Sequence, residues 1–285
     1  MVDSRLTGHE VLDEAVDRIE SGAFFLIAGP CVLEDDDLNL TVARGVRAAG
    51  CELGIPVVFK ASFDKANRSR LASARGPGIC RGLERLARVR DETGLPIVTD
   101  IHEPVQAAPV AEVADVLQIP AFLCRQTPLL VAAGETGRAV NVKKGQWMSP
   151  EAMAGAVEKV RAGGAGQVFV TERGTSFGYG DLVVDMRNFS RIRQATGAPV
   201  VFDGTHSVQQ PAGLADGSTS GAPEHIGALV RGAVAAGCDG LFLEVHPDPQ
   251  SAPSDATNML PLDGLIPLLR EVAAIRAALS PSVAV

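Results

Sequence analysis

The chain has 285 residues, a length typical of one eight-stranded α/β barrel. Its formal net charge of −8 at pH 7 argues against a nucleic-acid-binding protein, because such proteins need a basic face to neutralise phosphates. Hydrophobic residues make up 46% of the chain, enough to fill a sizeable core, yet no apolar stretch is long enough to span a bilayer.

Eight short apolar runs divide the chain, and their near-continuous hydrophobicity is typical of parallel strands buried on both faces. In chain order they are FFLIAGP (24–30), PVVFKASF (56–63), PIVTDIH (96–102), VLQIPAF (116–122), AVNVKKG (139–145), QVFVTERG (167–174), PVVFDGTH (199–206) and GLFLEVHP (240–247). Runs between them predict helices over 36–50, ending at Gly50, and over 80–94, 149–164, 223–237 and 261–280. A helix over 11–20 is expected to form a short N-terminal cap. The pattern predicts an α/β fold, a (β/α)₈ TIM barrel that forms a single domain over residues 1–285.

A polar residue able to do chemistry lies at or just past the end of each strand-like run. These residues are Cys31, Lys60 with Lys65, Asp100 with His102, Arg125, Lys143, Arg173, His206 and Glu244. In a (β/α)₈ barrel the C-terminal ends of all strands meet on one face, and chemistry occurs there. Cations and metal-ligand types dominate the set. The sequence therefore predicts a substrate that carries phosphate and carboxylate, handled beside a metal.

Four of these positions form a candidate metal site. Cys31 follows the first strand, His206 the seventh and Glu244 the eighth, and Asp255 lies in the loop beyond. Cys, His and carboxylate ligands suit zinc, iron(II) or manganese. No local ligand spacing exists, so the prediction depends on the barrel to bring these residues together. Taken singly, each has a structural alternative, since cysteines are commonly buried and a Glu at a strand end often pairs with a Lys.

The cations at the strand ends also have two interpretations. Arg binds phosphate or carboxylate with a planar fork, and Lys acts as a point charge. The alternative is a set of solvated charges or ion pairs with Asp64, Asp100 and Glu172. Function is favoured for Lys143 and Arg173. Neighbours on a strand point to opposite faces, so a solvated charge or an ion pair is favoured for Lys144.

Other patterns exclude several functions. The chain has no GxxxxGK[ST] and no GxGxxG, so nucleotide binding has little support. The N-terminus MVDSRLTGHE lacks the features of a signal peptide, and the five cysteines form no CxxC pair. A reducing, cytoplasmic location is therefore expected. Trp147, the single tryptophan, is expected either to wall the cavity or to pack in the core.

Nine segments together resemble the 3-deoxy-D-manno-octulosonate 8-phosphate synthase family. They are IAGPCVLE (27–34), FKASFDKANRS (59–69), RGPGI (75–79), TDIHEP (99–104), LQIPAFLCRQT (117–127), NVKKGQ (141–146), TERGTSFGYGDLVVDMR (171–187), FDGTHSVQQP (202–211) and EVHPDPQSAPSDATNMLPL (244–262). The resemblance implies a homotetrameric (β/α)₈ barrel and a C–C bond-forming transferase. Its reaction condenses phosphoenolpyruvate, D-arabinose 5-phosphate and water to 3-deoxy-D-manno-octulosonate 8-phosphate and phosphate, for lipopolysaccharide synthesis.

The resemblance also implies roles for single residues. Phosphoenolpyruvate would be held by Ser62, Lys143, Arg173 and the backbone near Ala121, and Gln118 joins the substrate-binding set. The sugar phosphate would be held by Asn67, Arg68 and Ser69, with Arg125 reaching in from a neighbouring subunit. The catalytic set would be Lys60, Lys65, Asp100 and His206, with Lys65 near the reacting aldehyde. One divalent metal ion would be held by Cys31, His206, Glu244 and Asp255.

Two alternatives stay open at this point. One is the related synthase that makes a seven-carbon acid from erythrose 4-phosphate, although Ala66-Asn67 replaces the Pro-Arg pair usual there. The other is a non-catalytic barrel that binds sugar phosphates. Within the resembling family, Cys31 indicates the metal-dependent branch, since metal-free members carry Asn at this position. Arg70 departs from the usual Ser and adds a charge beside the sugar-phosphate loop.

Overall fold

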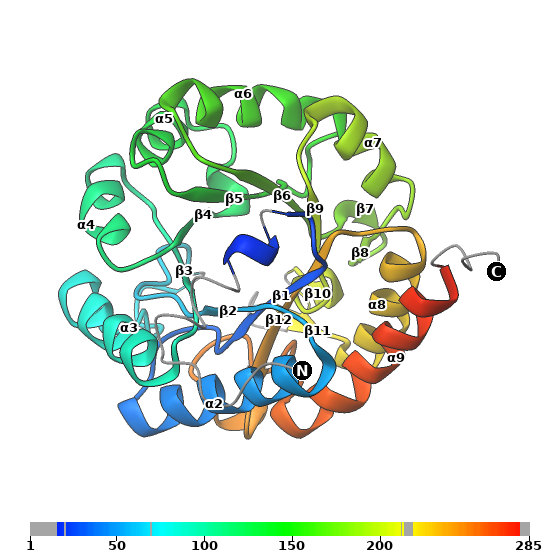
Figure 1. Cartoon of the computed structure of the whole chain (residues 1–285), viewed down its shortest axis with the longest axis horizontal. Helices are drawn as coiled ribbons and strands as arrows, with labels where there is room; N and C mark the ends of the chain where they lie inside the picture. Colours follow the sequence, from blue (N-terminus) through cyan, green and yellow to red (C-terminus); the bar gives the residue numbers. More distant parts are fainter. Residues whose placement is uncertain (1–15, 20, 69, 212, 214–218, 280–285) are drawn as a thin grey trace.

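A computed structural model describes residues 16–19, 21–68, 70–211, 213 and 219–279 of the chain. Its main sheet is a closed ring of parallel strands that pair in the order β1-β2-β3-β4-β5-β6-β9-β12, with β12 pairing back to β1 (Figure 1). The strands are β1 (Phe25–Gly29), β2 (Val57–Lys60), β3 (Ile97–Asp100), β4 (Val116–Ile119), β5 (Ala139–Lys143), β6 (Val168–Glu172), β9 (Val200–Asp203) and β12 (Gly240–His246). Each lies within one of the eight predicted runs, so the predicted (β/α)₈ barrel is confirmed.

Helices form a ring around the barrel (Figure 1). They are α2 (Asp36–Leu53), α3 (Ile79–Thr93), α4 (Ala107–Ala111), α5 (Thr127–Glu135), α6 (Ala154–Gly163), α7 (Asn188–Thr196), α8 (Ile226–Ala235) and α9 (Leu265–Leu279). Short 3₁₀ turns precede or replace helical segments at η1 (Pro104–Gln106), η2 (Ala121–Leu123), η3 (Glu151–Met153), η4 (His206–Val208), η5 (Pro223–His225), η6 (Pro249–Ser251) and η7 (Leu262–Gly264). No helix in the described part of the chain is long and apolar enough to cross a membrane.

The first long helix continues past Gly50, where the sequence predicted its end. It stops at Leu53, and Gly54 takes the left-handed conformation at φ 65° that ends a helix. Gly50 is buried inside the helix, and a Cβ there would lie 2.3 Å from the Val57 side chain. The glycine is therefore required for close packing of α2 on β2, not for termination.

Apolar side chains fill both sides of the barrel wall. Strand residues such as Phe25, Phe169 and Phe242 form a cluster inside the barrel, and Ile19 from the helical turn over 16–19 closes it. That turn lies over the barrel centre, in dark blue in Figure 1. It agrees with the predicted N-terminal cap, although residues 11–15 and 20 of the predicted helix lie outside the described residues. A larger cluster packs the outer strand faces against the helices.

Short additional strands lie beyond the barrel's C-terminal edge. β7 (Thr175–Gly178) and β8 (Asp181–Val183) form a hairpin, β10 (Gln209–Gln210) pairs with β11 (Ser220–Gly221), and β13 (Leu260–Pro261) extends beside β12. These segments follow β6, β9 and β12, respectively. They therefore surround the edge of the barrel at which the predicted functional residues lie.

Candidate active site

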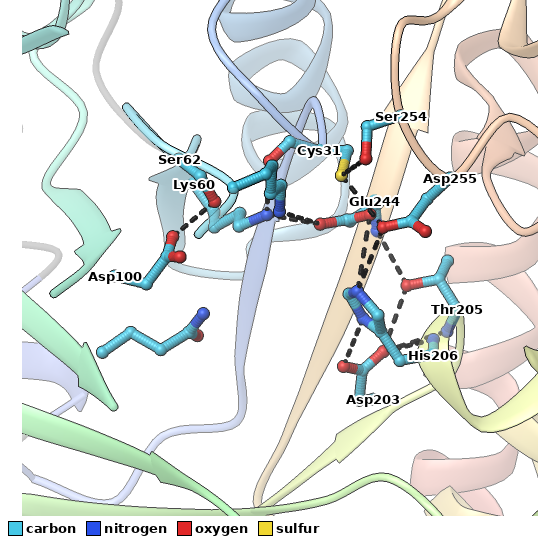
Figure 2. Close-up of polar contacts among 12 residues, drawn as sticks. Cys31, Lys60, Ser62, Asp100, Asp203, Thr205, His206, Glu244, Ser254 and Asp255 are labelled. Carbon is cyan, nitrogen blue, oxygen red and sulfur yellow. Dashed lines mark hydrogen bonds and ion pairs between the residues drawn. The ribbon is translucent and has the colours of Figure 1, made fainter. Parts of the chain in front are cut away.

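The chain turns tightly after β1, and this turn sets one side of the site. Gly29 approaches β2 so closely that a Cβ there would lie 2.0 Å from the Lys60 carbonyl oxygen. The buried Lys60 ammonium donates to the Cys31 carbonyl oxygen at 2.9 Å and forms an ion pair with Glu244. The ends of β1, β2 and β12 therefore meet around one buried ammonium (Figure 2).

Three of the four predicted metal ligands form one cluster, and the fourth lies beside it. The ligand atoms of Cys31, Glu244 and Asp255 lie within 4.8 Å of one another. The Cys31 thiol donates to Asp255 Oδ2 at 3.0 Å. His206 Nε2 is 3.6 Å from Glu244 Oε2 and 3.8 Å from Asp255 Oδ2 (Figure 2). Donors bound tetrahedrally to one ion at about 2.0–2.3 Å lie roughly 3.3–3.8 Å apart, so these residues fit a single divalent ion.

The His206 ring is held by a carboxylate in the way usual for metal-binding histidines. Asp203 Oδ2 lies 2.7 Å from His206 Nδ1, and Asp203 Oδ1 accepts from the His206 backbone N–H at 2.8 Å. A proton on Nδ1 leaves the Nε2 lone pair facing Glu244 and Asp255. The Thr205 hydroxyl also donates to Asp203, at 3.1 Å, and fixes that carboxylate.

Charge around the cluster keeps the Glu244 carboxylate ionised. Burial raises the pKa of Glu244, but the charges of Lys60, His206 and Lys65 outweigh burial and lower this pKa to about 2. Burial and the nearby carboxylates of Asp255 and Glu244 instead raise the pKa of the Cys31 thiol well above its ordinary value. The thiol is therefore protonated in the absence of a cation, and a bound divalent ion would reverse this.

Lys143 and Arg173 line the opposite side of the barrel mouth. The Lys143 ammonium pairs with Asp203 and lies 3.1 Å from the centroid of the Phe242 ring. Burial lowers the pKa of Lys143 to about 8, an effect that Asp203 partly offsets. Arg173 Nη2 donates to Gln209 Oε1 at 2.5 Å, whereas its buried Nη1 has no hydrogen-bond partner among the described residues. A buried, unpaired guanidinium nitrogen beside an ammonium suits an anionic ligand.

Polar residues on β2 to β5 line a third side. The Ser62 hydroxyl donates to Asp100, and His102 Nε2 lies 3.1 Å from the other oxygen of that carboxylate. Burial raises the pKa of Asp100, but His102 and Lys65 outweigh burial and hold this pKa below its usual range. Gln118, which pairs in register with Asp100, accepts from Asn141 Nδ2 at 3.0 Å. Ser62, Asp100 and Gln118 are thus brought together as predicted.

The loop after β2 adds a second guanidinium. Lys65 Nζ lies 3.8 Å from Glu244 Oε1, which brings Lys65 beside the cluster. Arg68 donates from Nε to the Ala74 carbonyl at 2.8 Å and from Nη1 to Ser254 Oγ at 2.6 Å. Its buried Nη2 has no partner among the described residues. The site therefore offers unpaired guanidinium nitrogens from two different loops.

Other predicted site residues are not joined to these contacts. Asn67 is exposed in the turn of the same loop, and Ser69 lies outside the described residues. Ala121 is half-buried at the start of η2, and Arg125 is exposed just after it. Within the described ranges, no contact links the Arg125 side chain to the site of its own chain. This leaves open the role predicted for it in a neighbouring subunit.

The sequence also predicted the surroundings of two residues next to the site, Lys144 and Trp147. Lys144 is fully buried and points away from Lys143, with its Nζ 3.5 Å from Glu172 Oε1, so of the two structural alternatives it forms the ion pair and is not a solvated charge. Trp147 does not pack in the core. It is 46% exposed and stacks on the exposed Phe122, with ring centroids 6.0 Å apart.

Three residues that complete the site were not predicted. Asp203 orients His206 and pairs with Lys143, Gln209 contacts Arg173, and Ser254 contacts Arg68 and Cys31. Asp203 carried a usable signal, because it is the last residue of β9 in the segment FDGTH. Gln209 and Ser254 lie in loops, where no periodic pattern indicates their partners.

Comparisons with known proteins agree with this geometry. The model of the DAHP synthetase I family matches residues 15–279. A 2-dehydro-3-deoxyphosphooctonate aldolase from Nitratidesulfovibrio vulgaris (strain DP4) is 59% identical over 251 residues, which cover 88% of this chain and 91% of the relative. A protein of the same name from Syntrophotalea carbinolica is 56% identical over 88% of this chain and 90% of the relative. Another from Koribacter versatilis is 52% identical over 91% of this chain and 94% of the relative.

Proposed function

We propose that this chain, which belongs to the DAHP synthetase I family, condenses phosphoenolpyruvate with D-arabinose 5-phosphate and water. The products are 3-deoxy-D-manno-octulosonate 8-phosphate, used for lipopolysaccharide synthesis, and inorganic phosphate. One observation carries the proposal: relatives 52–59% identical over about nine-tenths of the chain share the name of this aldolase. Two guanidinium groups at the site, Arg68 and Arg173, have unpaired nitrogens and support the proposal, because each substrate brings a phosphate.

The two substrates are assigned to opposite sides of the barrel mouth. Phosphoenolpyruvate lies against Lys143 and Arg173, with Ser62, Gln118 and the backbone near Ala121 completing its site. The sugar phosphate lies against Arg68, with Asn67 and Ser69 from the same loop. Preorganised cations neutralise two anions held side by side, and this positioning supplies much of the catalysis.

The reaction joins the methylene carbon of phosphoenolpyruvate to the aldehyde carbon of the sugar. Lys65 donates a proton or hydrogen bond to the aldehyde oxygen as negative charge develops there. Positive charge forms at the enol carbon and water adds to it, with Asp100 as the ionisable group that can receive the water's proton; His206 takes part as a ligand of the proposed metal ion. Phosphate then leaves the tetrahedral intermediate by C–O cleavage. Lys60 holds Glu244 in place through their buried ion pair.

Cys31, His206, Glu244 and Asp255 are the residues that would hold one divalent metal ion. The mixed sulfur, nitrogen and oxygen donors favour zinc, iron(II) or manganese. Bound there, the ion would supply Lewis-acid stabilisation of oxygen near the aldehyde or the attacking water. The raised pKa of the Cys31 thiol means that binding releases a proton.

The chain is proposed to act as a homotetramer in the cytoplasm, with Arg125 in the neighbour's sugar-phosphate site. Exposed Arg125 follows Phe122, whose ring is 55% exposed and stacked on Trp147. Exposed aromatic residues of this kind are typical of protein interfaces. Their position next to Arg125 supports a subunit contact that carries this guanidinium across.

Subunit complementation tests this shared site. Arg125→Ala and Lys143→Ala homotetramers should each be nearly inactive, because each lacks an anion-binding cation. Heterotetramers assembled from both should recover activity, up to about one quarter of the wild-type rate for random assembly, because some pockets then combine an intact Lys143 with a neighbour's intact Arg125. The measurement is phosphate release after mixing, unfolding and refolding. No recovery in heterotetramers verified by mass would contradict the shared site.

The pH dependence of phosphoenolpyruvate binding should report Lys143. Its pKa of about 8 means that the free enzyme loses this cation as pH rises above 8. We expect kcat/KM for phosphoenolpyruvate to fall about tenfold per pH unit there. The pKa of Lys143 is lower in the folded state than in the unfolded state, where it is about 10.4, so the folded state binds fewer protons between these two pH values. This group therefore makes the fold more stable as pH rises, and the fall in kcat/KM is not caused by unfolding. Lys143→Arg should abolish this decline, and an unchanged profile in that variant would refute the assignment.

Phosphate release from phosphoenolpyruvate tests the proposed function directly. The enzyme should release phosphate with arabinose 5-phosphate, much less with erythrose 4-phosphate, and not after chelation. Comparable turnover of erythrose 4-phosphate would favour the seven-carbon synthase. Binding of phosphoenolpyruvate without phosphate release with either sugar would favour a non-catalytic barrel.

A further inference from the structure

Ser254 lies between the proposed metal cluster and the proposed sugar-phosphate site. Its hydroxyl oxygen lies 3.1 Å from the Cys31 sulfur and accepts from Arg68 Nη1 at 2.6 Å. The side chain is buried, and Figure 2 shows it next to the Cys31 sulfur. Cys31 follows β1, Arg68 follows β2 and Ser254 follows β12. One hydroxyl therefore connects three loops and the two sites.

The hydroxyl can contact both neighbours at once. A serine hydroxyl has one donor and two acceptor positions. A cysteine sulfur that binds a divalent ion acts as a hydrogen-bond acceptor, so the Ser254 hydroxyl would donate to it. Arg68 can continue to donate to the same oxygen. The result is a chain from guanidinium to hydroxyl to thiolate, in which each hydrogen bond polarises the next.

Arg68 can bind a phosphate without leaving Ser254. Its Nε is used by the Ala74 carbonyl and its Nη1 by Ser254, while the buried Nη2 has no partner among the described residues. A phosphate on Nη2 satisfies that nitrogen and fixes the guanidinium plane. The Arg68 Nη1 donor is then fixed toward the Ser254 oxygen. Because that side of the oxygen is occupied, the Ser254 hydroxyl hydrogen is held toward the Cys31 sulfur.

We propose that Ser254 is a positioning residue that couples metal binding to sugar-phosphate binding, so that each ligand binds more tightly when the other is present. The inference rests on the proposed function for the identity of both ligands. Coupling between two binding sites is reciprocal, so the two affinities must change by the same factor.

The test measures binding, independently of turnover. Zinc dissociation constants are obtained by competition with a chromophoric chelator, with and without saturating arabinose 5-phosphate. In the wild type the sugar phosphate should tighten zinc binding at least about fivefold. Calorimetric titration of arabinose 5-phosphate into the zinc-free and zinc-loaded protein should give the same factor.

Three variants separate the coupling from direct contacts between ligands. Ser254→Ala should weaken zinc binding about tenfold and bring the coupling factor close to one. Ser254→Thr, which keeps the hydroxyl, should retain coupling. Ser207→Ala is the matched control, because among the described residues this buried hydroxyl donates to the Gly204 carbonyl, at 3.1 Å, and to neither Cys31 nor Arg68. It should behave as the wild type.

The outcomes distinguish this inference from the proposed function. If Ser254→Ala binds both ligands with the wild-type coupling factor, the inference is wrong and the proposed function stands. If wild-type protein shows no affinity for arabinose 5-phosphate, both are wrong. Circular dichroism of each variant establishes that altered coupling does not reflect unfolding.

Discussion

Replacement of Arg173 by alanine should lower kcat/KM for phosphoenolpyruvate by about 10²–10³-fold while the chain stays folded. Arg173 follows β6 at the barrel mouth, and one of its terminal nitrogens is buried without a partner among the described residues. A bidentate contact to a charged group contributes roughly 3–6 kcal/mol, since each such hydrogen bond contributes about 1.5–3 kcal/mol, and the expected fall corresponds to the lower part of this range. Lysine at this position keeps the charge but loses the fork, so Arg173→Lys should recover only part of the loss.

A second arginine provides the control. Arg231 lies on α8 outside the barrel, where it pairs with Glu271 at 2.8 Å, so Arg231→Ala removes a guanidinium far from the proposed site. It should leave kcat/KM unchanged, because an exposed ion pair contributes little to stability. Equilibrium dialysis with phosphoenolpyruvate separates binding from chemistry. Wild-type affinity in Arg173→Ala would show that another residue carries this contact.

The strands were predictable because their burial on both faces leaves a simple signal. Every barrel strand lies inside a predicted apolar run, and the last residue of β5 and the residue after it face as strand alternation predicts, with Lys143 inward and Lys144 outward. Short helices were not predicted. α4 has five residues, AAPVA, and lacks the two turns needed for a helical pattern.

Barrel topology made the strand-end part of the site predictable, whereas the loop contacts made by Gln209 and Ser254 were not. Barrel topology alone brings Cys31 and Glu244 together, because β1 pairs with β12. The partners of the cations depended on side-chain packing instead. Ion pairs were the structural alternative for these cations, and Lys60 and Lys143 do form them, but with Glu244 and Asp203 inside the site. Ser254 contacts Cys31 across 223 positions, a separation at which sequence spacing carries no information.

Removal of divalent metal should abolish turnover, and Cys31 should be the ligand that makes metal binding depend on pH. Cys31, Glu244 and Asp255 offer atoms within 4.8 Å of one another, and His206 faces the two carboxylates. Because the thiol carries a proton in the free protein, binding of one ion must release it. Metal affinity should therefore fall about tenfold for each unit by which pH decreases near neutrality.

Cys31→Ala should weaken metal binding by more than the roughly 10–100-fold that loss of an outer hydrogen-bond partner costs. It should also flatten the pH dependence, because the proton that is released belongs to this thiol. Cys124→Ala is the matched control, since Cys124 is a buried thiol outside the cluster. It should leave both the metal affinity and its pH slope unchanged.

Cys31→Asn separates a required metal from a required thiolate. In the family that the sequence resembles, metal-free members carry Asn at this position. The Cys31→Asn variant should therefore keep part of the wild-type rate in the presence of chelator, whereas Cys31→Ala should keep none. Phosphate release, measured alongside elemental analysis of each protein, provides the readout. If wild-type enzyme shown to be metal-free turns over at its full rate, the metal has no role. Cys31 is then a buried cysteine whose thiol only hydrogen-bonds Ser254 and Asp255.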